Sequence, residues 1–289
     1  MTLSTPQSLA AEVGFALPED YNASRLLWDN LRERADRPAV IHDSGVWTYG
    51  ALAEEAARIG GALRSAGLAP GERVLLFMDD EPAYPAAIMG AMRAGLVPVL
   101  INTVSPPDLI RFFLDDSGAR AVIASSAFAP HFEEDVLRDT ACEVVMDAGA
   151  RPWASEPGDL PEYPTKRRDM AFWMYSSGST GRPKGVVHKH EDAAYTAHTY
   201  ARSILNLGPD DICFSIPKIF FAYGFGNSVA FPMSVGAAAV LLSGRPTPER
   251  CFEQIAKGRP TVLFGLPTLY TALARAEAAA SAEIGRAHV

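Results

Sequence analysis

Apolar positions along this chain follow two alternating patterns, one typical of amphipathic helices and one typical of buried strands. The first helical face is formed by residues three or four apart, namely Leu52, Ala56, Ile59, Leu63 and Ala66. Thr48 stands where a helix N-cap is needed, and Gly67 stands where the helix should end. The next apolar run, Arg73–Met78, has no polar face, which is typical of a strand buried on both sides.

The alternation continues through the rest of the chain. Further helices are predicted over residues 82–94, 105–118 and 247–258, and further strands over residues 97–100, 121–124 and 261–264. We expect Ser105 to be the N-cap of its helix and Pro106 to be the first helical residue. Strands that alternate with helices of this length predict an α/β fold, with a mostly parallel sheet covered on both faces.

Prolines and mixed charges concentrate in residues 151–168, which we interpret as a linker. The predicted organisation is an N-terminal tail (1–21), a first α/β subdomain (22–150), this linker, and a second α/β subdomain (169–282). Residues 283–289 break an alanine-rich helix and match what a common sequencing-adapter DNA would encode. We therefore expect them to be a non-native end, with the second subdomain incomplete.

Composition narrows the classes of function. The chain has 289 residues, of which 48% are hydrophobic and 21% charged, which is typical of a globular protein. Its net charge of -8 argues against a nucleic-acid or membrane-surface partner, although a local loop of amides can still bind an anion. The apolar stretch 228–242 contains Pro232 and Gly236, so it is not a membrane span.

Cysteine usage and the start of the chain bear on the compartment. Cys142, Cys213 and Cys251 are widely spaced and form no CxxC motif, which argues against a disulfide framework or a zinc site. The first residues have no basic segment followed by an apolar one, so we see no signal peptide. We therefore expect a cytoplasmic protein.

Residues 175–185 carry the strongest chemical signal. Hydroxyl side chains, glycines and Lys184 lie between an apolar segment, Met170–Tyr175, and a second short strand at Val186–Val187. Small residues let backbone amides approach an oxyanion, and the lysine adds a full positive charge, so the loop suits a triphosphate. It is not a Walker P-loop, because Pro183 precedes the lysine and Gly185 follows it. A flexible Gly/Ser turn is the alternative.

This loop resembles the phosphate-binding signature of adenylate-forming enzymes, which include acyl-CoA synthetases, peptide-synthetase adenylation domains and luciferases. Trp47–Tyr49, Gly67–Val74 and residues 94–102 resemble other landmarks of that superfamily. The resemblance covers the chain from about residue 20 to 282. It implies the N-terminal domain of such an enzyme, truncated, with mostly parallel sheets covered by helices.

The resemblance implies an AMP-forming acid–thiol ligase that uses ATP, Mg²⁺ and CoA. A carboxylate attacks the α-phosphorus of ATP, and CoA then displaces AMP from the acyl-adenylate. Neutralising and positioning these anions is most of what the protein supplies. Lys184 and Thr180 are the candidate catalytic residues, and Thr180 is also a candidate contact to the phosphate-bound Mg²⁺. The candidates for phosphate binding are Ser176, Ser177, Gly178, Ser179, Thr180, Gly181 and Lys184.

The stretch Pro217–Asn227 bears on which acid is activated. Aromatic residues flank Ala222 and Gly224, and flat rings pack well against such a wall, although core aromatics are the alternative interpretation. The stretch resembles benzoate-CoA ligases specifically. That resemblance places Phe221, Ala222, Tyr223 and Gly224 at the aryl substrate, with Phe221 where many relatives carry histidine.

Two polar clusters are given structural interpretations. His188, His190 and His198 have no spacing that defines a metal site, so we interpret them as the start and exposed face of a helix. Residues 79–81 read as the acidic first turn of the next helix, where the helix dipole favours negative charge.

The resembling enzymes continue past this length. No segment here matches their magnesium-binding glutamate, ribose-binding aspartate or adenylation lysine, so we expect the 289-residue chain alone to be inactive. Two alternatives stay open. One is an enzyme that loads the acyl group on a carrier protein, and the other is a truncated domain that binds ATP or an aromatic acid without turnover.

Overall fold

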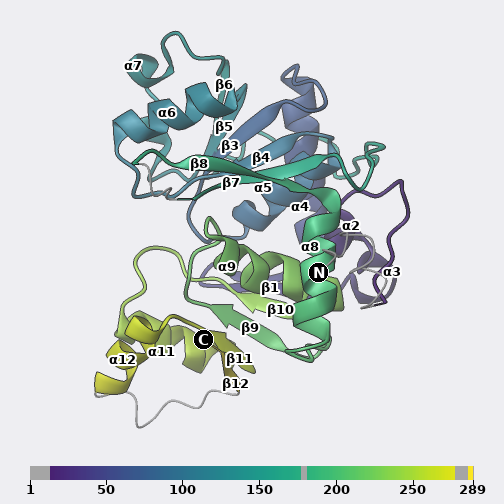
Figure 1. Cartoon of the computed structure of the whole chain (residues 1–289), viewed down its shortest axis with the longest axis vertical. Helices are drawn as coiled ribbons and strands as arrows, with labels where there is room; N and C mark the ends of the chain where they lie inside the picture. The colour runs from purple at the N-terminus through teal and green to yellow at the C-terminus, as the bar shows by residue number, and fades with distance from the viewer. Residues whose placement is uncertain (1–13, 177–180, 277–285, 289) are drawn as a thin grey trace, which may run out of the picture.

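The computed structural model describes residues 14–176, 181–276 and 286–288, which form two six-stranded sheets stacked with helices around and between them (Figure 1). The first sheet has the order β6-β5-β3-β4-β7-β8 and the second the order β12-β11-β9-β10-β1-β2. Neighbouring strands are parallel except for the β7–β8 and β1–β2 pairs, which are antiparallel. The predicted α/β fold with mostly parallel sheets is confirmed.

The strands of the first sheet are β3 (Arg73–Phe77), β4 (Val97–Leu100), β5 (Ala121–Ala124), β6 (Val144–Asp147), β7 (Met170–Ser176) and β8 (Lys184–Lys189). Those of the second are β1 (Pro38–His42), β2 (Gly45–Thr48), β9 (Ile212–Ser215), β10 (Ala238–Val240), β11 (Val262–Phe264) and β12 (Arg286–His288).

The longer helices are α4 (Tyr49–Ser65), α5 (Ala83–Arg93), α6 (Pro107–Ser117), α11 (Pro248–Gly258) and α12 (Pro267–Arg275). Short helices are α2 (Arg25–Trp28), α3 (Leu31–Arg34), α7 (Glu134–Leu137) and α8 (His190–Thr196), which continues into the π-helical η2 (Ala197–Arg202). A second continuous run consists of α9 (Ala222–Phe225), the π-helical η3 (Gly226–Ala230) and α10 (Phe231–Val235). Within the described residues, no helix is long and apolar enough to cross a membrane.

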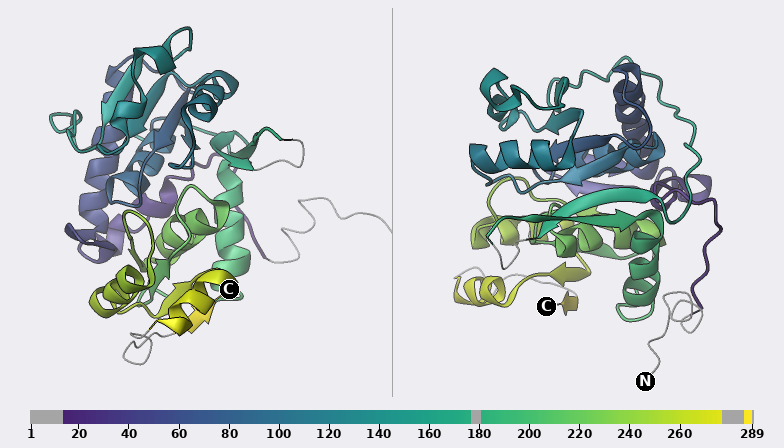
Figure 2. Two further views of the ribbon diagram at one scale, coloured as in Figure 1. Left: turned by 90° about the vertical axis from the view of Figure 1, so that its left-hand side faces the viewer. Right: turned by 45° about the horizontal axis from the view of Figure 1, so that its top comes forward.

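Both faces of the central strands are buried, and this explains why these strands read as continuous apolar runs, whereas the edge strands β8 and β2 are largely exposed. In β3, Leu75 and Phe77 pack with α6 on one side, whereas Val74 and Leu76 face the core shared with the second sheet. The far side of the second sheet is covered by α11 and α12. The molecule is therefore a stack of helix, sheet, helix, sheet and helix layers, which Figure 2 shows from two further sides.

Helix α4 and helix α5 fill the space between the sheets and approach each other unusually closely. A Cβ atom built on Gly90 would lie 2.1 Å from the carbonyl oxygen of Ala56, and one on Gly60 would lie 2.5 Å from that of Gly90. Only glycine permits this crossing, because such separations are far inside van der Waals contact. The crossing therefore holds α4 and α5 close together.

Each sheet draws strands from both sides of residues 151–168. Strands β7 and β8 complete the first sheet, and β1 and β2 lie in the second. The segment itself packs on α4: Trp153 is fully buried, and its indole Nε1 donates a 2.8 Å hydrogen bond to Glu55 Oε1. Arg151 pairs with the same carboxylate at 2.5 Å. The segment is therefore a packed connection between β6 and β7, two strands of the first sheet.

Of the two predicted helix caps, Thr48 is confirmed and Ser105 is wrong, and Thr247 is a further cap at the start of its helix. The hydroxyls of Thr48 and Thr247 each accept the backbone amide three residues further on, at 3.2 and 3.4 Å. Ser105 is not a cap, because the helix begins one residue later than predicted, at Pro107. Pro106 is extended, with ψ of 163°, since a residue before proline is disfavoured in the helical region.

Candidate active site

The predicted phosphate loop connects the antiparallel strands β7 and β8. Ser176 ends β7 and lies opposite Lys184, the first residue of β8. Gly181 has φ of +99°, a conformation that residues with a Cβ rarely adopt. Residues Ser177, Gly178, Ser179 and Thr180 lie outside the described residues. The structure thus brings Ser176 and Lys184 together at the ends of the loop.

Side chains at the base of the loop are held against α6. The Tyr175 hydroxyl donates a 2.7 Å hydrogen bond to Asp116 Oδ2, and the Tyr175 ring lies 4.5 Å from that of Phe113. Burial and the acceptor Asp116 raise the pKa of Tyr175 well above its usual value. On the other side of the loop, the Arg182 guanidinium lies 5.5 Å from the ring centre of Phe112. Both ends of the loop are therefore anchored to one helix.

The second predicted stretch forms the turn that enters α9. Phe221 is the extended residue before the helix and is half exposed, at 50%. Gly224 is buried, and a Cβ there would lie 2.0 Å from the carbonyl oxygen of Lys218. The turn is therefore folded tightly enough that position 224 must be glycine.

A cavity of about 150 Å³ lies between this turn and the β7–β8 hairpin. Ala222 lines it, together with Phe172 and Met174 of β7 and residues of α8, η3 and α10. Phe221, Tyr223 and Gly224 are not part of its wall. Cavities of this size, lined by apolar side chains, bind a benzene ring.

The Tyr223 side chain does not line this cavity and packs against the second sheet instead. Its ring packs edge-on against Phe264 of β11, with ring centres 6.3 Å apart. Burial raises the pKa of Tyr223 to about 12, so its phenol stays neutral near pH 7. Of the four residues predicted at the aryl substrate, the structure places only Ala222 on the cavity wall.

His188 lines the same cavity, which the sequence interpretation missed. Its ring stacks on Phe172 at 4.6 Å and an interplanar angle of 14°, and its Nδ1 lies 3.4 Å from Asp192 Oδ2. Phe172 and His188 are cross-strand partners, so their side chains share one face. That pairing depends on the strand register, which the loop sequence alone does not define.

The expected exposed helix face is wrong for His190, which is 1% exposed. Its Nδ1 accepts the backbone N–H of Ala23 at 3.0 Å, and burial lowers its pKa to about 4. His198 lies beside Phe15, with ring centres 5.5 Å apart. Within residues 14–176 and 181–276, no three or more His, Cys, Asp or Glu side chains are grouped to hold a metal ion.

The acidic residues before α5 also differ from their interpretation. The helix begins at Ala83, so residues 79–81 precede it and are not its first turn. Asp79 instead accepts a hydrogen bond from Lys218, 139 residues away, and Asp80 is 2% exposed. These carboxylates join the two sheets.

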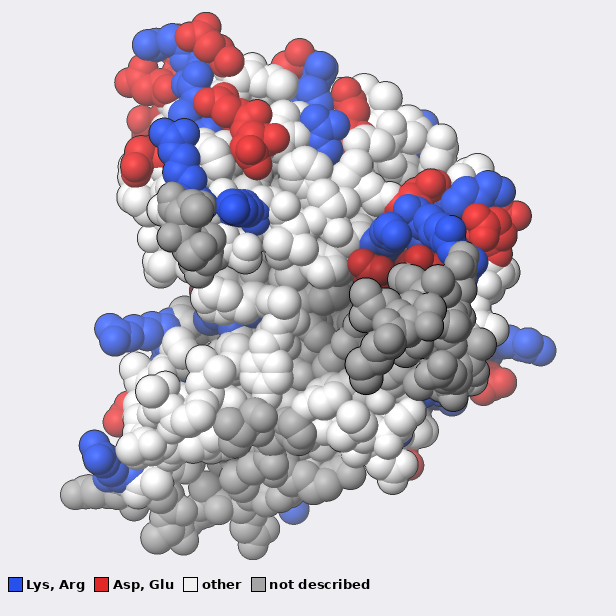
Figure 3. All heavy atoms as spheres, viewed as in Figure 1, with Lys and Arg blue, Asp and Glu red and all other residues white. Residues whose placement is uncertain are grey.

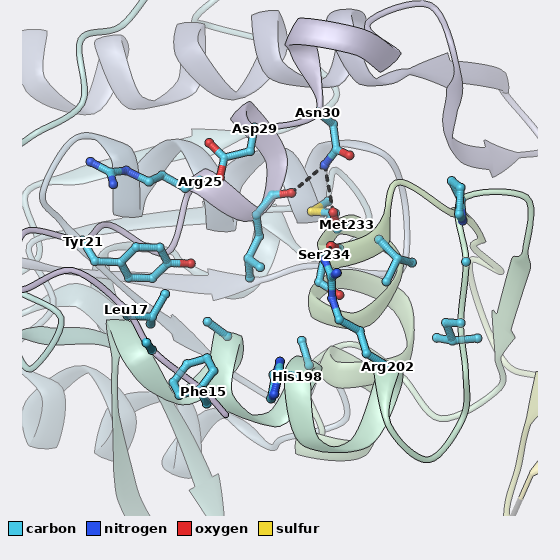
Figure 4. Close-up of a pocket in the computed structure, with 18 of the residues that line it drawn as sticks. Phe15, Leu17, Tyr21, Arg25, Asp29, Asn30, His198, Arg202, Met233 and Ser234 are labelled. Carbon is cyan, nitrogen blue, oxygen red and sulfur yellow. Dashed lines mark hydrogen bonds between the residues drawn. The ribbon is translucent and has the colours of Figure 1, made fainter. Parts of the chain in front are cut away.

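A larger cavity, of about 590 Å³, lies on another part of the molecule between residues 14–34, η2 and α10 (Figure 4). Several of its polar groups already bind other groups of the protein. Asn30 Nδ2 donates to the carbonyls of Leu26 and Met233, both at 2.8 Å, and Arg25 forms an ion pair with Glu162 at 2.8 Å. None of the residues predicted to bind phosphate or the aryl substrate lines it.

The space-filling view shows acidic and basic side chains side by side over the upper part of the face that it presents (Figure 3). Among the described residues, several such charges form ion pairs, as in Arg120 with Glu143 at 2.7 Å. Interspersed charge of this kind makes no extended positive surface there for a polyanion to follow.

The sequence of this chain matches a family model over most of its length. The family described as AMP-binding enzyme matches residues 27–288. The chain belongs to the AMP-binding enzyme family. A benzoate–CoA ligase of Thauera aromatica, one of its relatives, is 39% identical over 282 residues, which are 94% of this chain and 54% of that protein. The chain thus spans about half the length of the curated relatives it matches.

Solved structures agree with this assignment to the AMP-binding enzymes. A benzoate CoA ligase from Burkholderia xenovorans LB400 superposes with a TM-score of 0.81 at 39% identity, covering 89% of this chain and 52% of that one. The anthranilate CoA ligase AuaEII, solved in complex with anthranoyl-AMP, gives a TM-score of 0.89 at 29% identity over 92% of this chain and 54% of that one.

Proposed function

We propose that the protein carrying this chain activates an aromatic carboxylic acid, benzoate or a close analogue, to its CoA thioester through an acyl-adenylate. The observation that carries this proposal is the shared strand β7. Phe172 and Met174 of β7 line the 150 Å³ cavity, and Ser176, two residues later, begins the phosphate loop. A ring in the cavity therefore lies beside the strand that leads to the triphosphate.

Each part of the site has a role in the first step. Lys184, Ser176 and Gly181, with the loop residues between, hold the β- and γ-phosphates of the MgATP substrate. Ala222 and Phe172 hold the ring by packing against it. The carboxylate oxygen then attacks the α-phosphorus and forms a P–O bond, while the bond to pyrophosphate breaks. The products are acyl-AMP and pyrophosphate.

In the second step the CoA thiolate attacks the acyl carbon, and AMP leaves with the bonding electron pair. This step exchanges a C–O bond for a C–S bond and needs no oxidant or reductant. A carrier-protein thiol could take the place of CoA, with the same atoms exchanged. The three cysteines of the chain are buried and free, which supports our further proposal that the protein works in a reducing compartment such as the cytosol.

Mass spectrometry of the products tests this proposal. The longest product that the gene encodes is incubated with MgATP and benzoate, first without CoA and then with it. The expected products are benzoyl-AMP in the first reaction and benzoyl-CoA with AMP in the second. Benzoyl-AMP in both reactions would favour a carrier-protein acceptor, and the absence of both products would refute aromatic acid activation.

A further inference from the structure

A buried polar network joins the two sheets at the carboxyl ends of their strands. Lys218, three residues after β9, donates from Nζ to Asp79 Oδ1 at 2.8 Å and to the carbonyl of Leu242 at 2.5 Å. Asp79 follows β3, and Leu242 follows β10. The side chains of Lys218 and Asp79 are only 14% and 19% exposed, so this ion pair is largely desolvated.

Backbone amides of the second sheet reinforce the ion pair. The N–H of Ile219 donates to Asp80 Oδ1 at 3.1 Å, and the N–H of Gly244 donates to Asp79 Oδ2 at 2.5 Å. Asp80 is 2% exposed and follows Asp79 directly in the loop after β3. Two adjacent carboxylates of the first sheet thus hold two separate loops of the second.

His42 and Ser243 close the network on the side of β1. Ser44 donates its backbone N–H to His42 Nδ1 at 3.1 Å, so Nδ1 is unprotonated and Nε2 carries the hydrogen. His42 Nε2 then donates to Ser243 Oγ at 3.0 Å, and Ser243 Oγ donates to the carbonyl of Asp80 at 3.0 Å. Burial lowers the pKa of His42, which keeps this neutral tautomer near pH 7.

The turn after Lys218 leads directly to Ala222, which lines the proposed aryl cavity. The N–H of Phe221 donates to the carbonyl of Lys218 at 3.0 Å, which closes a tight turn, and Ala222 follows as the first residue of α9. Gly224 packs against the same carbonyl. Any displacement of Lys218 therefore moves Ala222, whereas the phosphate loop belongs to the sheet that carries Asp79 and Asp80.

We propose that Asp79, Asp80 and Lys218 are positioning residues for the aromatic acid: they hold the turn that carries Ala222 at a fixed position relative to the phosphate loop of the first sheet. This inference rests on the proposed function for its link to the substrate. None of the three side chains lines the cavity, so they act through the backbone of the turn.

The first test measures the network itself by amide hydrogen exchange with mass spectrometry. Lys218→Met keeps the side-chain stem but removes the donor, and Asp79→Asn removes one acceptor oxygen. Lys166→Met is the matched control, because it breaks the exposed Lys166–Asp20 pair at another surface. Exchange in peptides spanning 217–224 and 242–245 is expected to be roughly tenfold faster in the two network variants and unchanged in the control. Unchanged exchange in all three variants would overturn the proposal.

The second test measures the link to substrate in the longest product of the gene. In both network variants the KM for benzoate is expected to rise roughly tenfold while the KM for MgATP stays within about twofold. Asp80→Asn keeps the one acceptor oxygen that Ile219 uses, so this variant is expected to retain a KM for benzoate close to that of the wild type. A fall in kcat with both KM values unchanged would show a merely structural role. If the wild type activates no aromatic acid, the proposed function fails, and the exchange measurement still decides whether the network holds the turn.

Discussion

At the scale of single residues, Lys184 places a full positive charge beside a loop otherwise made of small side chains. Its side chain is exposed, and among the described residues it makes no salt bridge. Its charge is therefore available to an incoming anion. The sequence motif predicts Lys184 at the end of the phosphate loop, and the β7–β8 register places it there, opposite Ser176.

Replacing Lys184 with alanine should weaken MgATP binding, because a charge-assisted contact to phosphate is lost. Such contacts are worth roughly 1.5–3 kcal/mol, which corresponds to about a tenfold to hundredfold rise in Kd. Isothermal titration with MgATP measures the change, and Lys189→Ala, at the far end of the same strand, is the control. Equal affinity in wild type and Lys184→Ala would remove this residue from the phosphate site.

Ala222 should set which ring substituents the cavity accepts. Ala222→Leu adds volume to a cavity of only about 150 Å³, and overpacking of this kind costs roughly 1–3 kcal/mol. Substituted benzoates should therefore lose kcat/KM before benzoate does, and Ala222→Gly should relax the same preference. Identical kcat/KM ratios across the acids in all three proteins would place Ala222 outside the substrate pocket.

His190 should make folding stability depend on pH. Its folded pKa of about 4 lies below the ordinary value of 6.5, so the unfolded chain takes up a proton first as the pH falls. The stabilisation is complete above about pH 6.5 and is lost progressively towards pH 4, by about 2–4 kcal/mol in total. Urea unfolding between pH 7.5 and 4.5 should show a shallower decline for His190→Asn, whose amide oxygen can still accept from Ala23. The exposed His131→Asn is the control, and equal slopes in all three proteins would contradict this account.

At the scale of elements, local chemistry predicted most helix ends and strands. Thr48 caps its helix as expected, and Thr247 does the same for α11, because their hydroxyls act on the residues that follow directly. The π-helical turn η3 was not predicted, since Pro232 within an apolar run reads only as a break. In the structure the run stays helical, and the turn before Pro232 widens because the proline has no N–H to donate to Ser228.

The close packing of α4 against α5 can be tested by adding a methyl group at Gly90. Gly90→Ala places a Cβ about 2.1 Å from a backbone carbonyl, so the helices must separate, and the cost should be about 1–3 kcal/mol or more. Gly61→Ala is the matched control on α4, because its Cβ meets only the Glu156 side chain, at 3.4 Å. The control should be neutral or stabilising by up to about 1 kcal/mol, since alanine favours helix. Urea unfolding of the two variants decides this, and equal stability would contradict the close packing.

At the scale of the whole molecule, the parallel α/β class followed from the alternation of helices and strands, but the assignment of strands to sheets did not. Strands β1 and β2 precede the first sheet in the chain and yet complete the second. The Asp79–Lys218 pair joins residues 139 positions apart, and nothing local to either residue indicates the other. Long-range pairing of this kind depends on the packed layers, which local periodicity does not encode.

Activity also depends on the whole molecule, because catalysis needs residues from several parts of the enzyme. The chain carries the residues proposed to contact the phosphates and the ring, but its sequence has no match to the magnesium glutamate, ribose aspartate or adenylation lysine of the enzymes it resembles. Removing even one preorganised stabiliser typically costs on the order of a hundredfold in rate. We therefore expect the 289-residue chain alone to form no measurable benzoyl-CoA.

The central claim is that this chain carries the acid-activating site for an aromatic acid. Acid-dependent exchange of labelled pyrophosphate into ATP tests it most directly, because exchange reports the adenylation step without CoA. The longest product of the gene is predicted to support exchange with benzoate, to show only background exchange with acetate, and to lose most of its activity in Lys184→Ala. Equal exchange with benzoate and acetate, or no exchange with any aromatic acid, would contradict the account.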